Sequence, residues 1–380
     1  MKVAFCIYGY SDETAPLQPW LTVREVAAGM AERGWEVHMV TDVAEHAGQT
    51  TFVHHHVESM RPSNAGRMAD ILRSIDADRL VVLSTPLNLA TSSWYGVARG
   101  DLYAFLSYPF YTQKELVRAI RHLTISDLVT YGRHALVPRL VWARTLRRNF
   151  AGVIAQSSRT ADRVADAAGG RIQRHVIQAG VDLDFWRPGC VADSGADEEN
   201  VRFLYVGSAK TIRGFDVLIS AFSRLDSDKA TLRILARGGD EAEVDALRLS
   251  LKARLGARAE KVSLQGGWME RDALREEIRS ADVVVLPFVL VPSELPVSVI
   301  ECVASGTPVI TTDIDGLPEA AGEAGMIVRS GDPRALSKAM ARIVDDAALR
   351  RKLSLACENE RSRYEGWEVV AQRWCDVLGD

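Results

Sequence analysis

The chain has 380 residues, more than one hydrophobic core comfortably serves, so we expect two α/β domains of nearly equal size. Its composition is that of a globular protein, and a formal net charge of −4 argues against a nucleic-acid partner, which would favour a basic excess. No apolar run approaches the ~18 residues of a membrane span, and the first residues fit a buried strand better than a signal peptide, so a cytoplasmic location is expected.

Short strands rich in Val, Ile and Leu alternate with helical patterns along the chain, which predicts parallel sheets with helices on both faces. In the first half, strands are predicted at 2–8, 36–41, 51–57, 79–84, 102–107, 152–156 and 174–178. In the second half, they are predicted at 202–206, 231–236, 261–264, 283–287, 308–312 and 325–328. A helix near 21–33, ended by Gly34, should connect the first two strands.

Residues 114–150 form a basic region, with eight Lys or Arg and two Asp or Glu. A helix predicted over 136–150 places apolar residues beside four arginines. Such a helix could associate weakly with an anionic membrane, or it could pack within the protein and leave a solvated basic face, which is the simpler interpretation.

A linker is predicted at WRPGCVADSGADEEN (186–200), which contains a Pro-Gly pair and no apolar period. We therefore expect domains at 1–187 and 188–362, followed by a terminal segment at 363–380. In that segment, Trp367 and Trp374 share one face of a predicted helix. The helix could dock on its own domain or across the domain junction.

The stretch SELPVSVIECVASGTPV (293–309) predicts a helix with one buried face, Pro296 in its first turn and Gly306 at its end. Glu294 then lies just before the helix and Glu301 inside it. Because a helix start carries free N–H groups and a positive dipole end, it is a natural anion site.

Metal and disulfide chemistry find little support in the sequence. His54–His56 lie on a predicted strand, where neighbouring side chains point to opposite faces, so at most two of them converge. The five cysteines are scattered without a CxxC pair, which favours reduced thiols. We expect no metal site.

Four stretches together resemble the family 4 glycosyltransferases, retaining enzymes of the GT-B architecture, in which two Rossmann-like domains face a central cleft. They are VIQAGVDLDFWRP (176–188), LYVGSAKTIRGFDVLISAF (204–222), ADVVVLPFVLVPSELPVSVIECVASGTPVITTDIDGLPE (281–319) and GWEVVAQRW (366–374). The resemblance covers nearly the whole chain. It implies an acceptor-binding N-terminal domain, a donor-binding C-terminal domain and a terminal helix that crosses back to the former.

The implied reaction is transfer of a sugar from a nucleotide-diphosphate donor to an acceptor hydroxyl, with retention at the anomeric carbon. A UDP-sugar is the first choice of donor and a GDP-sugar the second, while the acceptor and the oligomeric state stay open. The resemblance implies no obligatory metal, and no other cofactor is expected. Side-chain cations and helix N-termini would then stabilise the leaving diphosphate.

The resemblance assigns roles to two cations and two glutamates. Arg213 and Lys210, in the loop after the strand that ends at Gly207 and Ser208, would bind the diphosphate. Glu301 would bind the ribose, and Glu294 would orient the transferred sugar, although it lies one residue closer to Pro296 than the family pattern has it. The other residues implied at the helix start and beside the nucleobase are Leu295, Pro296, Val297, Ser298, Trp268 and Met269.

The N-terminal half departs from the family pattern. Where the family has paired glycines before the first helix, this chain has QPWL (18–21). The family's histidine beside the transferred sugar could correspond to His122, Ser107 or Tyr108. Two rival functions are a nucleotide-sugar 2-epimerase of related fold and a degenerate sugar-nucleotide-binding protein without catalysis. A nicotinamide dehydrogenase is disfavoured because no GxGxxG follows the first strand.

Overall fold

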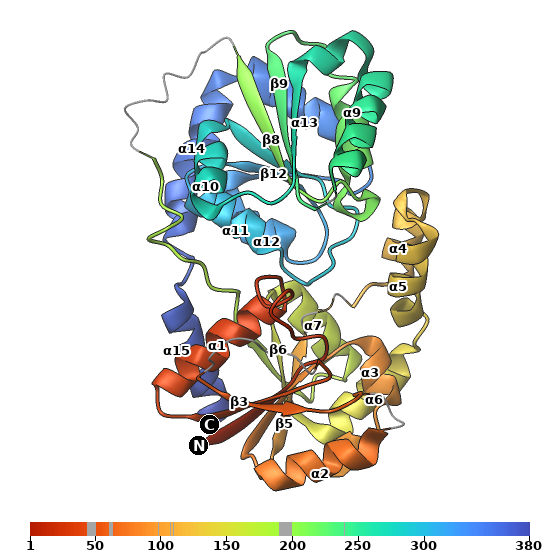
Figure 1. Ribbon diagram of the computed structural model, residues 1–380, viewed down its shortest axis with the longest axis vertical. Coiled ribbons are helices and arrows are strands. Elements are labelled where there is room, and N and C mark those ends of the chain that lie inside the picture. Colours follow the sequence, from red (N-terminus) through yellow and green to blue (C-terminus); the bar gives the residue numbers. More distant parts are fainter. Residues whose placement is uncertain are drawn as a thin grey trace.

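A computed structural model of the chain describes residues 1–43, 51–60, 64–97, 99–106, 108, 110–189, 200–238 and 240–380. Two α/β halves are stacked along the long axis, with the N-terminal half below and the C-terminal half above in Figure 1. Each half is built on one parallel sheet with helices on both faces, as the alternating pattern predicts.

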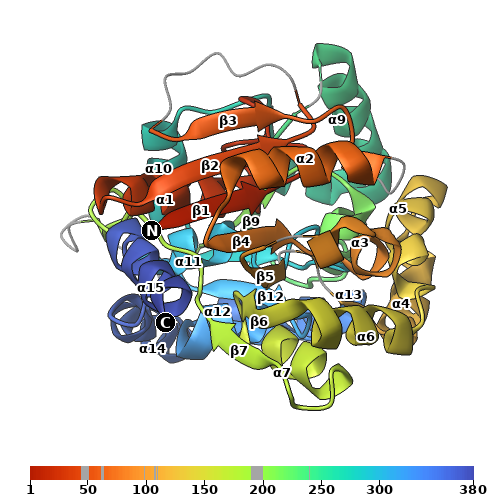
Figure 2. The same cartoon turned by 90° about the horizontal axis from the view of Figure 1, so that it is seen from below.

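The N-terminal sheet has the strand order β3-β2-β1-β4-β5-β6-β7, with all neighbours parallel, and Figure 2 shows these strands side by side. Its strands are β1 (Lys2–Cys6), β2 (Glu36–Thr41), β3 (Val53–His56), β4 (Arg79–Leu83), β5 (Asp101–Leu106), β6 (Phe150–Ala155) and β7 (Gln173–Val176). The α-helices of this half are α1 (Trp20–Glu32), α2 (Ala65–Ile75), α3 (Pro86–Thr91), α4 (Gln113–Ala119), α5 (Ile125–Ala135), α6 (Arg139–Asn149) and α7 (Ser158–Ala167).

The C-terminal sheet has the order β10-β9-β8-β11-β12-β13 and is also parallel throughout. Its strands are β8 (Val201–Gly207), β9 (Ala230–Ala236), β10 (Val262–Gly266), β11 (Val283–Leu286), β12 (Val309–Thr312) and β13 (Gly325–Val328). The α-helices of this half are α8 (Phe215–Phe222), α9 (Glu241–Leu255), α10 (Arg271–Ser280), α11 (Val297–Ala304), α12 (Leu317–Ala321), α13 (Pro333–Asp345), α14 (Ala347–Arg361) and α15 (Trp367–Gly379).

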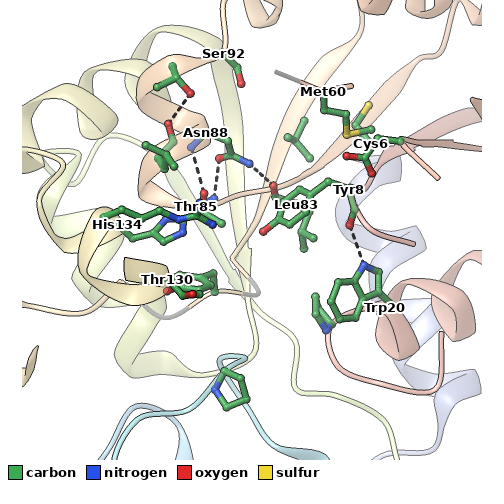
Figure 3. A pocket seen from close by; sticks show the side chains of 18 of the residues that line it. Cys6, Tyr8, Trp20, Met60, Leu83, Thr85, Asn88, Ser92, Thr130 and His134 are labelled. Atoms are coloured by element: carbon green, nitrogen blue, oxygen red, sulfur yellow. Dashed lines mark hydrogen bonds between the residues drawn. The ribbon is translucent and has the colours of Figure 1, made fainter. Parts of the chain in front are cut away.

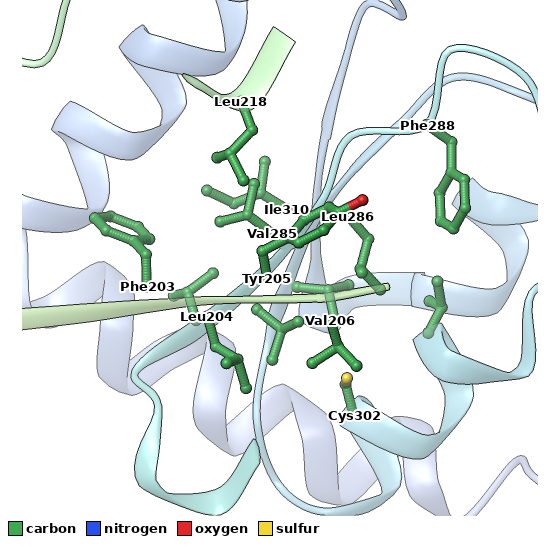
Figure 4. Packing of buried hydrophobic residues seen from close by; sticks show 14 of the residues in the cluster. Phe203, Leu204, Tyr205, Val206, Leu218, Val285, Leu286, Phe288, Cys302 and Ile310 are labelled. Atoms are coloured by element: carbon green, nitrogen blue, oxygen red, sulfur yellow. The ribbon is translucent and has the colours of Figure 1, made fainter. Parts of the chain in front are cut away.

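The core of the C-terminal half explains why its strands read as continuous apolar runs. Tyr205 of β8, Val285 of β11 and Ile310 of β12 are buried side by side, with Leu218 of α8 above them and Cys302 of α11 below (Figure 4). Because helices cover both faces of the sheet, neither face of a central strand can carry exposed polar residues.

All thirteen strands expected from the sequence are present in the described residues, with ends shifted by up to two residues. The expected helix after β1 is α1, and Gly34 beyond its end adopts φ +80°, a left-handed conformation that favours glycine. Most of the expected linker, residues 190–199, lies outside the described residues.

Two local expectations were wrong. Pro296 is the N-cap of α11 and does not lie in its first turn, because its ψ of 112° is extended. The helix expected over 136–150 begins only at Arg139, since Pro138 disfavours helical geometry at the residue before it. Leu136 and Leu140, two of the apolar residues of that expected helix, are both 77% exposed.

The terminal helix α15 crosses from the C-terminal half and packs beside α1, as the resemblance implies (Figure 1). Trp374 is buried in the N-terminal core, where its ring lies 6.1 Å from that of Phe5 and 5.2 Å from that of Phe105. Arg79 also donates a hydrogen bond of 2.7 Å to the carbonyl of Leu378. The chain therefore ends in the core of the domain in which it began.

Replacing Trp374 with alanine is expected to lower the free energy of unfolding by roughly 3–5 kcal/mol, because it removes a large buried ring and leaves a cavity in the N-terminal core. Denaturation in guanidinium chloride would measure the loss. Val369→Ala, on the half-exposed side of the same helix, serves as the control. Equal losses in both variants would mean that the tryptophan contributes little to docking.

Candidate functional site

The carboxyl end of β8 leads into a loop that places Arg213 against the C-terminal core. Arg213 ends a short 3-10 helix, η5 (Thr211–Arg213), and its guanidinium carbon lies 5.0 Å from the ring centroid of Phe288. The next residue, Gly214, has φ +76°, and a Cβ there would lie 1.7 Å from the carbonyl oxygen of Pro287. Only glycine therefore allows the loop to approach so closely.

Arg213 is a half-buried cation without a carboxylate partner among the described residues, and its buried Nε has no hydrogen-bond partner there either. A Cβ at Gly207 would come within 2.7 Å of this Nε, so the glycine at the strand end makes room for the guanidinium. Lys210, three residues earlier, is exposed to solvent. Both cations can accept an anionic ligand without first breaking an ion pair within this part of the chain.

Arg237 is a further cation of this site, and the sequence analysis missed it. It follows β9 directly, and its guanidinium lies 5.4 Å from the ring centroid of Trp268, which is 69% exposed. Burial lowers the pKa of Arg237, Glu301 opposes that shift, and the like charge of Arg213 adds to it. The available signal was an arginine at the end of a predicted strand, followed by Gly238.

Glu301 lies on α11, and its charge interacts with that of Arg237. Burial raises the pKa of its carboxyl, while the positive charges of Arg237 and Arg271 lower it. We call Arg213, Arg237 and Glu301 the arginine cluster. It lies at the carboxyl edge of the parallel sheet, the edge at which such folds bind ligands.

The start of α11 supplies backbone donors. Val297 and Ser298 are its first residues, and in the described part of the chain no backbone or side-chain atom accepts a hydrogen bond from their amides. Leu295 and Pro296, which precede them, are buried. Met269 is half-buried beside the exposed Trp268. The expected residues thus form two groups, one at the start of α11 and one, Trp268 and Met269, just after β10.

Glu294 lies in the seam between the two halves. It is completely buried and accepts hydrogen bonds from the amides of Gln156 (2.9 Å) and Ser157 (2.8 Å) and from the Ser157 hydroxyl (2.7 Å). Burial raises the pKa of its carboxyl to about 8, and these hydrogen bonds oppose the rise. The expected sugar-facing carboxylate is therefore engaged in a contact between domains.

Ser157 is the N-cap of α7, and a second carboxylate binds at the same end of that helix. Glu319 accepts hydrogen bonds from the amide (2.9 Å) and hydroxyl (2.7 Å) of Ser158, the first residue of α7. The positive end of the α7 dipole favours both contacts. Arg159, one residue further, donates to the carbonyl of Asp313 (2.8 Å). The N-terminus of α7 thus holds the C-terminal half against the N-terminal half.

A cavity of about 530 Å³ lies in the N-terminal half, beside the seam. Its walls come mainly from the carboxyl ends of β1 and β4 and from α3 and α5 (Figure 3). Pro292 of the C-terminal half also lines it. Gln18, Pro19 and Trp20 also line it, with Trp20 Nε1 donating to the carbonyl of Tyr8 (2.9 Å). The segment that replaces the family's paired glycines therefore forms a wall of this cavity.

The three candidates for the family histidine fall in different places. Tyr108 lines the cavity, and its ring lies 4.4 Å from that of His134. His122 is instead within 3.1 Å of the carbonyl oxygen of Gly331 in the C-terminal half. Ser107 lies outside the described residues. His134 was not considered from the sequence; burial lowers its pKa to about 4, so it is neutral near pH 7.

Within the described residues, no three His, Cys, Asp or Glu side chains are grouped as a metal site would require. Nor does any helix in those residues combine the length and apolar character needed to span a membrane.

Known proteins resemble this chain in sequence and in fold. Residues 200–346 match the family model described as Glycosyl transferases group 1. The chain is 28% identical over 243 residues to a D-inositol 3-phosphate glycosyltransferase of Streptomyces avermitilis, covering 59% of this chain and 51% of the relative. It is 27% identical over 219 residues to an alpha-maltose-1-phosphate synthase of Mycobacterium tuberculosis, covering 53% and 56%. The chain thus spans about half the length of the curated relatives it matches.

Solved structures resemble the whole chain. HepE from Anabaena in complex with UDP has a TM-score of 0.72 at 17% identity and covers 100% of both chains. Sucrose-phosphate synthase from Thermosynechococcus elongatus has a TM-score of 0.70 at 20% identity and covers 99% of this chain and 98% of the other. The fold is therefore that of the two-domain GT-B proteins. Residues 200–346 form a domain of the Glycosyl transferases group 1 family, which confirms the resemblance drawn from the sequence motifs.

Proposed function

We propose that the protein is a retaining glycosyltransferase that moves a sugar from a nucleotide-diphosphate donor to an acceptor hydroxyl without an obligatory metal. The observation that carries the proposal is the arginine cluster, in which Arg213 and Arg237 follow the neighbouring strands β8 and β9, paired at Gly207 and Ala236, and the charge of Glu301 acts on Arg237. HepE, of like fold, was solved with UDP and with UDP-glucose, which supports a UDP-sugar as donor. A GDP-sugar is the second choice.

The cations answer the main demand of this reaction. As the glycosidic bond breaks, negative charge develops on the leaving diphosphate, and preorganised cations stabilise it most effectively where water is excluded. Arg213, Lys210 and the amides of Val297 and Ser298 would supply that stabilisation. Glu301 would accept hydrogen bonds from the ribose hydroxyls, and Trp268 or Met269 would lie beside the base.

No side-chain nucleophile is needed for retention. In a front-face reaction the acceptor attacks from the side that the diphosphate leaves, and the protein contributes positioning and charge. The N-terminal domain, residues 1–187, would hold the acceptor and residues 188–362 the donor. We place the reaction in the cytoplasm, where nucleotide sugars are substrates of soluble enzymes.

The test of the donor site is calorimetric titration with UDP, GDP, ADP and TDP, each with and without EDTA. We expect UDP to bind most tightly and the chelator to change nothing. Arg237→Ala should weaken UDP binding about tenfold, the effect of losing one charge-assisted contact. Arg248→Ala, an exposed arginine on α9, should leave binding unchanged.

Other outcomes would point to the rival functions. If none of the four nucleotides binds, the site is degenerate and the resemblance describes the fold alone. If a UDP-sugar is converted to an isomeric sugar without any acceptor, the protein is an epimerase. EDTA-sensitive binding that added Mg²⁺ restores would contradict the metal-independent mechanism.

A further inference from the structure

Four buried polar atoms that line the N-terminal cavity lack hydrogen-bond partners within the described residues. They are Gln18 Nε2, Trp94 Nε1, Tyr108 Oη and His134 Nδ1. Trp94 is 3% exposed and His134 8%. Because buried polar groups are nearly always paired, four unpaired atoms around one cavity indicate contacts that a bound molecule completes.

The walls that carry these atoms are held firmly. Trp94, at the start of the 3-10 helix η2 (Trp94–Val97), packs 4.6 Å from the ring of Tyr95, which in turn meets Phe150 at 5.1 Å. Asn88 is already satisfied, since it donates to the carbonyl of Leu83 (2.7 Å) and accepts from the amide of Thr85 (2.8 Å) (Figure 3). The unpaired indole N–H of Trp94 is therefore held in place by packing on its neighbours.

The rest of the cavity is mainly apolar and has little net charge. Most of its other walls are aliphatic, sulfur-containing or aromatic side chains, among them Cys6, Met60, Val82, Leu83, Leu87 and Tyr95, and its remaining polar lining is uncharged: Thr85, Asn88, Thr91, Ser92 and Thr130. The charged side chains that line it are Asp42 and Arg133, of opposite sign, and Asp42 already accepts a hydrogen bond from the amide of Gly9 (2.7 Å). A phosphate group buried here would lack the cluster of cations that it needs.

The cavity adjoins the arginine cluster. Tyr131 of α5 lines the cavity and stacks on Tyr108 at 6.0 Å. Helix α5 also meets the loop that carries Arg213, because the hydroxyl of Thr211 donates a hydrogen bond of 3.4 Å to Asp127 Oδ2. Pro292, which also lines the cavity, lies in the segment that leads to α11. A molecule in the cavity would thus lie beside the proposed donor.

We propose that this cavity binds the acceptor, and that the acceptor is an uncharged, largely apolar phenol or alcohol with ring oxygens or carbonyls. Trp94 and Gln18 can only donate through these nitrogens, so the ligand must present oxygen lone pairs to them. The volume suits a molecule of drug-like size. The phosphorylated acceptor in the name of the Streptomyces avermitilis relative fits this cavity poorly.

The inference rests on the proposed transfer reaction and specifies its second substrate. The acceptor oxygen forms a bond to the anomeric carbon of the sugar. The bond from that carbon to the diphosphate oxygen breaks, and its electron pair stays on the diphosphate. That oxygen then takes the proton of the acceptor hydroxyl.

The test uses the full chain and two probes, 7-hydroxycoumarin as a neutral phenol and inositol 1-phosphate as a charged polyol. Binding of the first is followed at pH 6 by its fluorescence and of the second by calorimetry. We expect 7-hydroxycoumarin to bind and inositol 1-phosphate not to displace it. Trp94→Phe and Tyr108→Phe, which remove only an N–H and an O–H, should each weaken coumarin binding about tenfold.

Trp35→Phe, a half-buried tryptophan that does not line the cavity, is the matched control and should bind the coumarin as the natural chain does. Absence of coumarin binding, binding unaffected by both cavity variants, or displacement by inositol 1-phosphate would overturn the inference. UDP titration of the same samples separates the two proposals. If UDP binds and the coumarin does not, only the proposed class of acceptor is wrong. If the coumarin binds and UDP does not, the proposed transfer reaction is wrong.

Discussion

Arg213→Ala should lower kcat by about 10²–10³-fold, the loss typical of removing one preorganised group that stabilises charge in a transition state. Arg213 is half-buried on Phe288 and, among the described residues, has no carboxylate partner. Its charge is therefore available to the leaving diphosphate, where negative charge grows only as the glycosidic bond breaks. The KM for the acceptor should change little, because Arg213 acts on the donor side.

Steady-state kinetics with UDP-glucose and an accepted phenol would measure this split. Arg213→Lys should recover part of the rate, since it keeps the charge but loses the planar guanidinium. Arg248→Ala, far from the arginine cluster on an exposed face of α9, is the control. A comparable drop in the control, or a loss confined to acceptor KM, would contradict the role given to Arg213.

Glu294→Ala should lower the free energy of unfolding by about 2–4 kcal/mol, because it leaves the amides of Gln156 and Ser157 buried without an acceptor. The same change should loosen the contact between the two halves. Chemical denaturation would measure the loss. A loss within about 0.5 kcal/mol, as at an ordinary surface position, would show that the seam does not depend on this carboxylate.

Glu294→Gln isolates the ionisation of the same group. In the folded protein the pKa of Glu294 is raised from 4.5 to about 8, so between these values the folded state keeps a proton that the unfolded state has lost. The stability of the natural chain relative to Glu294→Gln should therefore fall as the pH rises from about 4.5 to about 8. A difference that stays constant, or grows, over this range would show that the pKa is not raised.

Prediction from the sequence succeeded where the signal is local. The strands at the centre of each sheet are runs of apolar residues bounded by turn residues, and Gly34 and Gly306 mark helix ends because only glycine adopts positive φ without strain. Errors at Pro296 and at residues 136–138 are also local, since proline moves a helix start by a few residues. Arg213 and Glu301 were identified because the motif around each is contiguous.

The place of Arg237 and the contacts of Glu294 depend on residues that are distant from them in the sequence. Arg237 became a site residue only when β9 and β8 paired and α11 brought Glu301 beside it. Glu294 meets Gln156 across 138 positions of chain, so nothing in its own motif shows that its carboxylate caps α7. The unpaired atoms of the cavity, on four separate segments, carry no motif at all.

The sequence by itself determined the two parallel sheets, through local apolar periodicity, and the class of domain at residues 200–346, through contiguous motifs. The crossing of the terminal helix was implied only by the family resemblance, because the residues of that helix left open which domain it docks on. Only the tertiary structure decided which side chains share a site. A carboxylate facing a ligand and one capping a helix in another domain have the same sequence signal, and their difference arises from the packing of the two halves. The neutral, aromatic character of the cavity was likewise decided by packing, since its walls come from separate segments of the N-terminal half together with Pro292.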